Sequence, residues 1–325
     1  MRTLFFGTPA ISVPAFEALT TISEVVGVVC QPDRPSGRGM KMRPPAVKIA
    51  ALAKNIEVYQ PEKVKDGALA NWIREKNADL ALVIAYGRIL NREVLDAPLN
   101  GCLNLHASLL PEYRGAAPIQ RGLMDGRGET GLCLMQMDEG MDTGDVLSTY
   151  RLPIEPEETA GSLAEKMGAL AAEMTRREIP RFMARELKPT PQAHDAATYA
   201  PPITKDDSLL DLNQEANTLQ NQIRGLAPRP GASCRHLSKT SGQERRLRIV
   251  SAKALNSEEI SSRSLAVGEV DINCGRLLVG CGKQTCLEIL EAQLEGKKCL
   301  GATDLVNGRT LSAGDRLSSL SLSGS

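Results

Sequence analysis

Short β-rich runs alternate with helical stretches through the first half of the chain. Alternation of strands and helices along a chain is typical of parallel strands joined by crossover helices. This half is therefore expected to form an open α/β sheet. Ligands bind such sheets beyond the carboxyl ends of the strands. The expected strands are Thr3–Phe6, Val25–Cys30, Leu80–Ala85 and Cys102–His106, and the expected helices are Val13–Leu19, Ala46–Ala53, Gly67–Asn77 and Ala117–Met124.

The second half has a different texture. A chain of 325 residues exceeds the roughly 250–300 residues at which single cores stop growing, which favours two domains. A long helix is expected over Thr159–Ala184, followed by a proline-rich linker and then a helix over Asn213–Arg224. Short strands separated by glycine and polar turns then indicate a small β-barrel. The predicted parts are a first domain at 1–188, a linker at 189–206, a barrel domain at 207–315 and a frayed tail at 316–325.

Charge and cysteine usage exclude several classes of protein. Lysine plus arginine equals aspartate plus glutamate at 39 each, so contact with a polyanion must come from a local patch. The start has no export-type signal and no apolar run reaches the ~20 residues of a membrane span, so we expect a cytoplasmic protein without membrane contact. The eight cysteines form no C-x-x-C pair and there are three histidines, so we expect no metal.

Gly7-Thr8-Pro9 follows the first predicted strand, where a dinucleotide-binding enzyme would have its glycine-rich turn. The pattern G-x-G-x-x-G is absent from this position. A structural glycine in a tight turn is therefore favoured over a phosphate site. A nicotinamide-dependent dehydrogenase is disfavoured for the same reason.

Two polar side chains stand at the end of the fourth predicted strand. The alternation of a strand places Asn104 and His106 on one face and Leu105 on the other. A lone histidine in an apolar run is usually structural. An amide donor beside an imidazole, however, is what a developing oxyanion requires, so the pair is a candidate for catalysis.

A loop rich in acids and glycine follows a further expected strand, Leu132–Met137. The loop reads MQMDEGMDTGD over residues 135–145 and includes Asp138 and Asp142. The spacing of its acids does not fit a calcium-binding EF-hand. It remains either a solvated turn or the source of a carboxylate that orients His106 or accepts a proton.

Together these segments resemble the formyl-tetrahydrofolate-dependent formyltransferases. The resemblance is carried by Asn104-x-His106, the following SLLPxYRG at 108–115 and the later Asp142-Thr143-Gly144. GAAPIQ at 115–120 and QPDRPxGRG at 31–39 are similar to the branch of that family that acts on initiator methionyl-tRNA. The resemblance implies a Rossmann-like catalytic domain with a mostly parallel sheet and a C-terminal barrel of the OB type.

The resemblance also implies roles for particular residues. Asn104, His106 and Asp142 would be catalytic, moving a formyl group from 10-formyltetrahydrofolate, the donor co-substrate, to the amine of methionyl-tRNA. The residues implied for folate binding are Ser108, Leu109, Leu110, Pro111, Tyr86, Gly87, Ile89 and Asp138. Folate and initiator methionyl-tRNA are thus the expected partners of a chain that we expect to be a monomer.

A basic loop follows the second predicted strand. Its cations lie among prolines and glycines that let a backbone mould to a ligand, at the predicted active edge of the sheet. An exposed charge run is usually only a solvated surface, but here it can grip phosphates of a tRNA acceptor end. The residues expected to bind tRNA are Arg34, Arg38, Lys41 and Arg43. A second basic stripe, at Arg245, Arg246, Arg248 and Lys253, lacks aromatic neighbours for base stacking.

Three other interpretations stay open from the sequence. A sister formyltransferase that acts on a small amine would use the same three polar residues, but would not need the basic loop or the second domain. A non-catalytic folate- or RNA-binding protein would be expected to have lost one of the three. A hydrolase that releases formate is chemically possible, although nothing in the sequence favours water over an amine.

Overall fold

The structure is a computed structural model that describes residues 1–36, 40–255 and 265–320. The chain forms two compact units. Unit 1 comprises residues 1–118, 129–154 and 163–201, and unit 2 comprises residues 119–128, 155–162 and 202–325. The two units are described separately below.

Unit 1 is built on a seven-stranded sheet with the order β10-β9-β7-β6-β1-β2-β5. The five strands from β7 to β5 are parallel, whereas β9 and β10 run antiparallel to their neighbours. The mostly parallel α/β sheet predicted from the sequence is therefore confirmed. The strands are β1 (Arg2–Gly7), β2 (Glu24–Val29), β5 (Val58–Tyr59), β6 (Leu80–Ile84), β7 (Cys102–His106), β9 (Glu129–Gln136) and β10 (Val146–Pro153).

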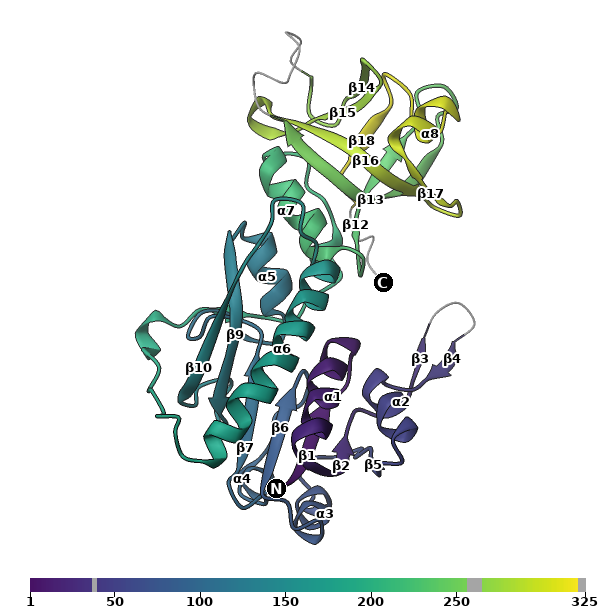
Figure 1. Cartoon of the computed structure of the whole chain (residues 1–325). Coiled ribbons are helices and arrows are strands. Elements are labelled where there is room, and N and C mark those ends of the chain that lie inside the picture. Colours follow the sequence, from purple (N-terminus) through teal and green to yellow (C-terminus); the bar gives the residue numbers. More distant parts are fainter. Residues whose placement is uncertain (37–39, 256–264, 321–325) are drawn as a thin grey trace. The chain divides into compact units, whose positions relative to one another are not determined.

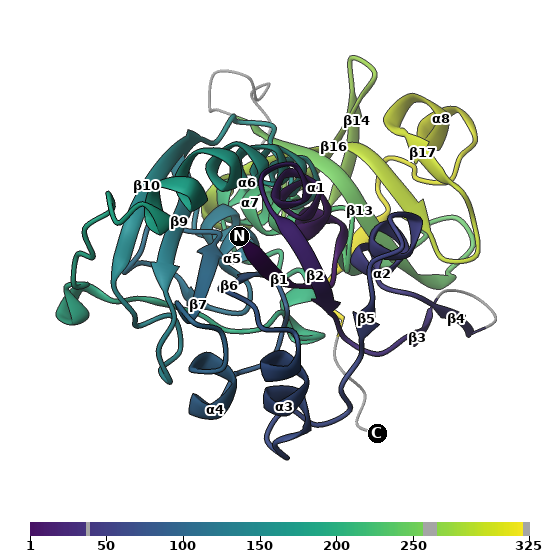
Figure 2. The ribbon, with the colours of Figure 1, turned by 60° about the horizontal axis from the view of Figure 1, so that its bottom comes forward.

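Helices cover both faces of this sheet, as Figures 1 and 2 show for α1 and α6 on one face and α3 and α4 on the other. Alternate residues of each strand pack against the helices on one face of the sheet and on the other. In β1, Phe5 packs with the α1 side, while Leu4 and Phe6 pack with the α3 side. Burial on both faces explains the continuous apolar strand sequences. The helices are α1 (Val13–Ile22), α2 (Ala46–Ala53), α3 (Ala68–Glu75), α4 (Arg92–Leu95) and α6 (Ala160–Met183).

Two small strand pairs lie outside the main sheet of unit 1. β3 (Arg34–Ser36) and β4 (Lys41–Arg43) form a hairpin after β2, in the segment that the sequence indicated as a loop. β8 (Arg114–Gly115) pairs in parallel with β11 (Tyr199–Ala200). This second pair ties the end of the predicted linker, residues 189–206, to the motif that follows His106.

Unit 2 is an antiparallel sheet with the order β14-β15-β16-β13-β12-β18. Its two outer strands meet: the Val270 amide donates to the Asp315 carbonyl at 3.0 Å, and the Leu317 amide donates to the Gly268 carbonyl at 2.8 Å. These bonds close the sheet into a barrel, which removes its open edges. The strands are β12 (Ala232–Leu237), β13 (Glu244–Leu255), β14 (Val270–Asn273), β15 (Arg276–Gly280), β16 (Cys286–Leu294), β17 (Cys299–Gly301) and β18 (Arg316–Ser318).

The barrel core is apolar and is covered by a helix. Leu219, Ile223 and Leu226 on α7 (Ala216–Leu226) pack with Leu247 and Ile289 of the strands. The other helices assigned wholly or mainly to unit 2 are α5 (Pro118–Met124) and α8 (Ala302–Asn307). Arg316–Ser318 was expected in a frayed tail, but it forms β18 because Leu317 completes this core and pairs with β12.

No helix within the described ranges 1–36, 40–255 and 265–320 is long and apolar enough to cross a membrane.

Candidate active site

The polar pair at the end of β7 faces one side of the sheet. Leu103 and Leu105 pack in the layer of α1 and α6, whereas Cys102 packs in the layer of α3. Asn104 and His106 share the side of Cys102 because side chains alternate along a strand. They are 9% and 5% exposed, so both polar groups lie within the protein and depend on internal partners.

Asp142 brings its carboxylate to both residues from the loop between β9 and β10. The Asn104 Nδ2 donates to Asp142 Oδ1 at 3.3 Å, and His106 Nδ1 lies 3.5 Å from the same oxygen. The other oxygen, Oδ2, accepts the Gly115 amide at 2.8 Å. The three residues that the sequence put forward as catalytic therefore form one contact cluster, across a separation of 38 residues.

The backbone around Asp142 is held in an uncommon conformation. Asp142 has φ 55°, in the left-handed region that aspartate tolerates better than most residues. Next to it, a Cβ on Gly144 would lie 1.8 Å from the Gln136 carbonyl oxygen. Only glycine permits this approach. Backbone of this kind persists where surrounding contacts determine it, and it is typical of functional loops.

The orientation of His106 follows from its second partner. His106 Nε2 lies 2.9 Å from the Tyr113 carbonyl oxygen, which can only accept, so Nε2 carries a hydrogen. Nδ1 is then the nitrogen that faces Asp142.

A buried arginine and a glutamine support the Asp142 loop. Arg114 belongs to the SLLPxYRG motif but was given no role from the sequence, and Gln192 was not singled out. Gln192 Nε2 donates to the carbonyls of Asp142 at 3.0 Å and Gly144 at 2.7 Å. Its Oε1 accepts from Arg114 Nη2 at 2.7 Å and Nε at 3.1 Å. Arg114 is 2% exposed and also contacts His194 Nδ1 at 3.2 Å. No local pattern indicated Gln192, which lies in the segment expected to be a linker.

The segment 108–111, expected to bind folate, follows β7 directly. Ser108 is buried, and its hydroxyl donates to the Glu112 carbonyl at 2.6 Å, which closes the turn. Leu109, Leu110 and Pro111 are half-buried. Ser108 thus shapes the loop through its hydroxyl, while the three apolar residues after it supply partly open surface.

The second expected folate segment follows β6, the neighbouring parallel strand. Tyr86 is 2% exposed, and burial raises the pKa of its hydroxyl to about 12. That hydroxyl has no protein partner among the described residues. Gly87 has φ 81°, and Ile89 is 62% exposed. Asp138, in the Asp142 loop, accepts from the Gly140 amide at 3.1 Å and the Thr143 hydroxyl at 2.7 Å.

Three of the four expected tRNA-binding cations lie on the β3–β4 hairpin. Arg34 pairs directly opposite Arg43, and Ser36 opposite Lys41, so Arg34, Lys41 and Arg43 belong to one face. All three are exposed. Arg38 lies outside the described residues. Like charges placed opposite each other on a hairpin repel, which favours an anion on that face.

The base of the hairpin is fixed by a polar network. Lys48 Nζ contacts Asp33 Oδ1 at 2.8 Å and Gln60 Oε1 at 2.7 Å. The hydrogen bonds from Lys48 and Gln60 lower the pKa of Asp33. Lys48 is therefore paired within the protein.

Comparison with known families agrees with this arrangement. The formyl transferase family profile matches residues 1–179, and the profile of the formyl transferase C-terminal domain matches residues 202–310. A methionyl-tRNA formyltransferase of Sorangium cellulosum is 49% identical, covering 97% of this chain and 98% of its own. The chain belongs to the methionyl-tRNA formyltransferase family. Another member, from Halorhodospira halophila, is 42% identical over 97% of this chain and 98% of its own.

Solved structures share the fold of this formyltransferase family member at low identity. An N-formyltransferase from Helicobacter canadensis, in complex with folinic acid and dTDP-3-aminofucose, matches with a TM-score of 0.63 at 15% identity, covering 88% of this chain and 98% of its own. HypX from Aquifex aeolicus, in complex with tetrahydrofolic acid, matches with a TM-score of 0.60 at 17% identity, covering 96% of this chain and 48% of its own. The Rossmann-like assignment of the first domain is thereby confirmed.

Proposed function

We propose that this protein transfers the formyl group of 10-formyltetrahydrofolate to the α-amine of initiator methionyl-tRNA. The observation that carries the proposal is the contact cluster of Asn104, His106 and Asp142 at the carboxyl end of β7. It lies at the edge where parallel sheets bind ligands. The relatives that match along nearly the whole chain are named for the same reaction.

Formyl transfer requires an amine to attack the formyl carbon on N10 of the folate. The carbonyl oxygen then carries negative charge in a tetrahedral intermediate. When this intermediate collapses, the bond between the formyl carbon and N10 breaks, and N10 leaves with its electron pair. Asn104 has a second amide hydrogen besides the one it donates to Asp142. Directed at the developing oxyanion, one such donor is worth about 2.7–4 kcal/mol.

The attacking amine must also lose a proton. Asp142 and His106 share a side-chain contact of 3.5 Å, which provides a place for that proton between Oδ1 and Nδ1. The proton held between Oδ1 and Nδ1 then passes to N10, which takes the electron pair of the broken C–N bond and leaves as the amine of tetrahydrofolate. Positioned proton transfer of this kind contributes about 10²–10⁴-fold. No covalent enzyme intermediate is needed.

The folate is proposed to lie between the segments that follow β6 and β7. Its pteridine would contact Tyr86, Gly87, Ile89 and the Asp138 loop, where the buried Tyr86 hydroxyl is available to a polar ring atom. Leu109, Leu110 and Pro111 would supply apolar surface. Ser108 would act through the turn that it closes.

The tRNA is proposed to contact the cations of the basic loop, Arg34, Arg38, Lys41 and Arg43. A positive face on an exposed hairpin suits the phosphates of an acceptor end, which set position and affinity but carry no sequence information. We further propose residues 1–188 as the catalytic domain and 207–315 as a tRNA-binding domain. The proposed location of the protein is the cytoplasm, and its proposed state is a monomer.

A transfer assay tests the proposal. Radiolabelled formyl-tetrahydrofolate is incubated with methionyl-tRNA, with a small amine acceptor such as a glycinamide ribonucleotide, or with buffer alone. Label is expected on methionyl-tRNA, with loss of transfer in His106→Ala. Label on the small amine, or release as formate without acceptor, would overturn the tRNA assignment and leave the folate site standing.

A further inference from the structure

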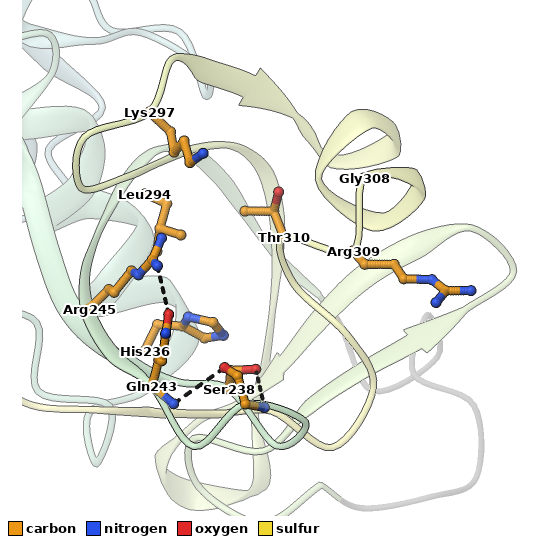
Figure 3. Close-up of a pocket in the computed structure, with 10 residues that line it drawn as sticks. His236, Ser238, Gln243, Arg245, Leu294, Lys297, Gly308, Arg309 and Thr310 are labelled. Carbon is orange, nitrogen blue, oxygen red and sulfur yellow. Dashed lines mark hydrogen bonds between the residues drawn. The ribbon is translucent and has the colours of Figure 1, made fainter.

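Unit 2 has a polar cavity of about 220 Å³ that the proposed reaction does not use. This is far larger than the ~10–15 Å³ that holds one water. Residues from the β12–β13 hairpin, the turn before β17 and the turn after α8 line it, as Figure 3 shows. The lining includes Arg245, Lys297 and Arg309, and none of the described residues that line it is acidic.

A buried histidine forms part of the wall. His236 is 3% exposed, and its Nε2 lies 2.8 Å from Asp315 Oδ2. The Asp315 carboxylate also accepts the Lys239 amide at 2.8 Å and the Ser312 amide at 2.9 Å. These donors fix the carboxylate, and the carboxylate in turn fixes the imidazole ring.

The other ring nitrogen of this histidine has no partner among the described residues. His236 Nδ1 is buried without a hydrogen bond, and an unsatisfied buried polar atom is destabilising. With a carboxylate on Nε2, Nδ1 is the nitrogen that remains to meet a ligand, and it donates when the ring is protonated. An unpartnered nitrogen in a cavity wall is the mark of a site built for a ligand rather than of a surface hollow.

The surrounding charges define what the ligand must be. In Figure 3, Arg245 and Lys297 lie around the space beside His236 and Thr310, whereas Arg309 extends away from it. Arg245 Nη2 donates to Gln243 Oε1, a neutral partner, at 2.6 Å. Neither Arg245 nor Lys297 has an ion-pair partner within the described part of the chain. Glu244, the carboxylate next to Arg245 in the sequence, is paired with Arg235 at 3.1 Å. Two cations and an imidazole around one space favour a compact oxyanion.

We propose that this cavity is a phosphate-binding site, with His236, Arg245 and Lys297 as ligands and the hydroxyl of Thr310 as a further donor. The phosphate group can come from a polynucleotide backbone or from a small phosphate-bearing molecule, because both present the same oxygens. The site lies in unit 2, whereas the formyl-transfer cluster lies in unit 1.

Nuclear magnetic resonance of ¹⁵N-histidine in the full chain tests this site directly. The protein has only three histidines, and the His194→Gln and His106→Gln variants assign the His236 signals by elimination. Inorganic phosphate is titrated against sodium chloride at equal ionic strength, and deacylated tRNA is titrated in parallel. The expected result is a saturable shift of the His236 signals with phosphate or with tRNA, and none with chloride.

Matched variants separate a built site from diffuse charge. Lys297→Gln and Arg245→Gln are each expected to raise the half-saturating concentration about tenfold, the loss of one charge-assisted contact. Lys298→Gln removes the same charge from the next residue, which does not line the cavity, and is expected to change it less than twofold. These surface variants leave the His236–Asp315 pair intact, and thermal melts check their folding.

Each outcome decides the proposal. A shift with inorganic phosphate supports a site for free phosphate compounds, and a shift with tRNA alone supports a backbone-phosphate site. No shift with either ligand would overturn the proposal, as would an equal loss in Lys298→Gln and Lys297→Gln. Because the signals are read without formyl transfer, failure of the proposed enzymatic activity would not affect the result.

Discussion

Gln192 binds Asp142 through the backbone rather than through the carboxylate. Its Nε2 donates to the Asp142 and Gly144 carbonyls, while its Oε1 accepts two hydrogens of the buried Arg114. The side-chain amide of Gln192 thus connects the buried Arg114 to the loop that contains Asp142. It holds the left-handed backbone of Asp142 in place without occupying either carboxylate oxygen.

Removal of this amide should therefore impair chemistry more than binding. In Gln192→Ala we expect kcat for formyl transfer to fall by about 10–100-fold, because a displacement of ~1 Å in a reacting group can cost ~10²-fold. The KM for folate should change little. Steady-state kinetics give both values. Asp195→Ala, an exposed change three residues away, is the control, and a purely structural role for Gln192 would lower only the melting temperature.

An asparagine at position 142 removes the negative charge of Asp142 but keeps the shape of the side chain. In Asp142→Asn the side chain keeps an oxygen for the Gly115 amide but loses the anion beside His106. We expect kcat to fall by about 10²–10⁴-fold, the usual range for a positioned proton acceptor. Single-turnover transfer measures the chemical step. Asp145→Asn changes a neighbouring carboxylate and should stay within about twofold of the parent; an equal loss there would argue against a special role for Asp142.

Much of the fold of unit 1 could be predicted because its strands are buried on both faces, and this burial directly determines their apolar sequences. Strands covered on both faces must be apolar throughout, so β1 and β6 are recognisable in the sequence as the short apolar runs LFF and LALVI. The alternation at Asn104 and His106 is equally local. That Asp142 meets them across the fold came from the resemblance to known formyltransferases, since no periodicity links positions 38 residues apart.

Other features had no local signal. Gln192 interacts with backbone oxygens 48 and 50 residues away, and any residue type at those positions presents the same carbonyls. The sequence of the β3–β4 hairpin predicts a loop because prolines and glycines surround it. Strand β18 lies in a serine-rich stretch and is fixed by the pairing of Leu317 with β12. In each case a long-range contact overrides weak local propensity.

The Arg121–Asp207 pair is expected to stabilise unit 2 in a pH-dependent way. Two hydrogen bonds from Arg121, at 2.6 and 2.8 Å, lower the pKa of Asp207 to about 2. A depressed carboxyl pKa contributes stability that is present above the unfolded value near 4 and is lost as pH falls toward 2.

Asp207→Asn should lower the free energy of unfolding by about 1–2 kcal/mol at pH 7, allowing for solvent screening of a partly exposed pair. The difference from the parent should be the same at pH 5 and should shrink at pH 3. Calorimetric melts at the three pH values measure it. Asp206→Asn, at an adjacent residue without this arginine partner, serves as the control. A gap that grows on acidification would contradict the ion-pair explanation.

The cations of the β3–β4 hairpin should act on tRNA alone. Each of Arg34→Gln, Lys41→Gln and Arg43→Gln removes one positive charge from an exposed strand, so we expect weaker tRNA binding and an unchanged KM for folate. The slope of log affinity against log salt should fall by about one for each phosphate that no longer meets a cation. Relief of the Arg34–Arg43 repulsion should leave the melting temperature equal or slightly higher.

Fluorescence anisotropy of labelled tRNA at several salt concentrations gives the slopes. Arg176→Gln, an exposed arginine on α6, is the matched control, and an equal slope change there would mean that the hairpin contributes only general positive charge.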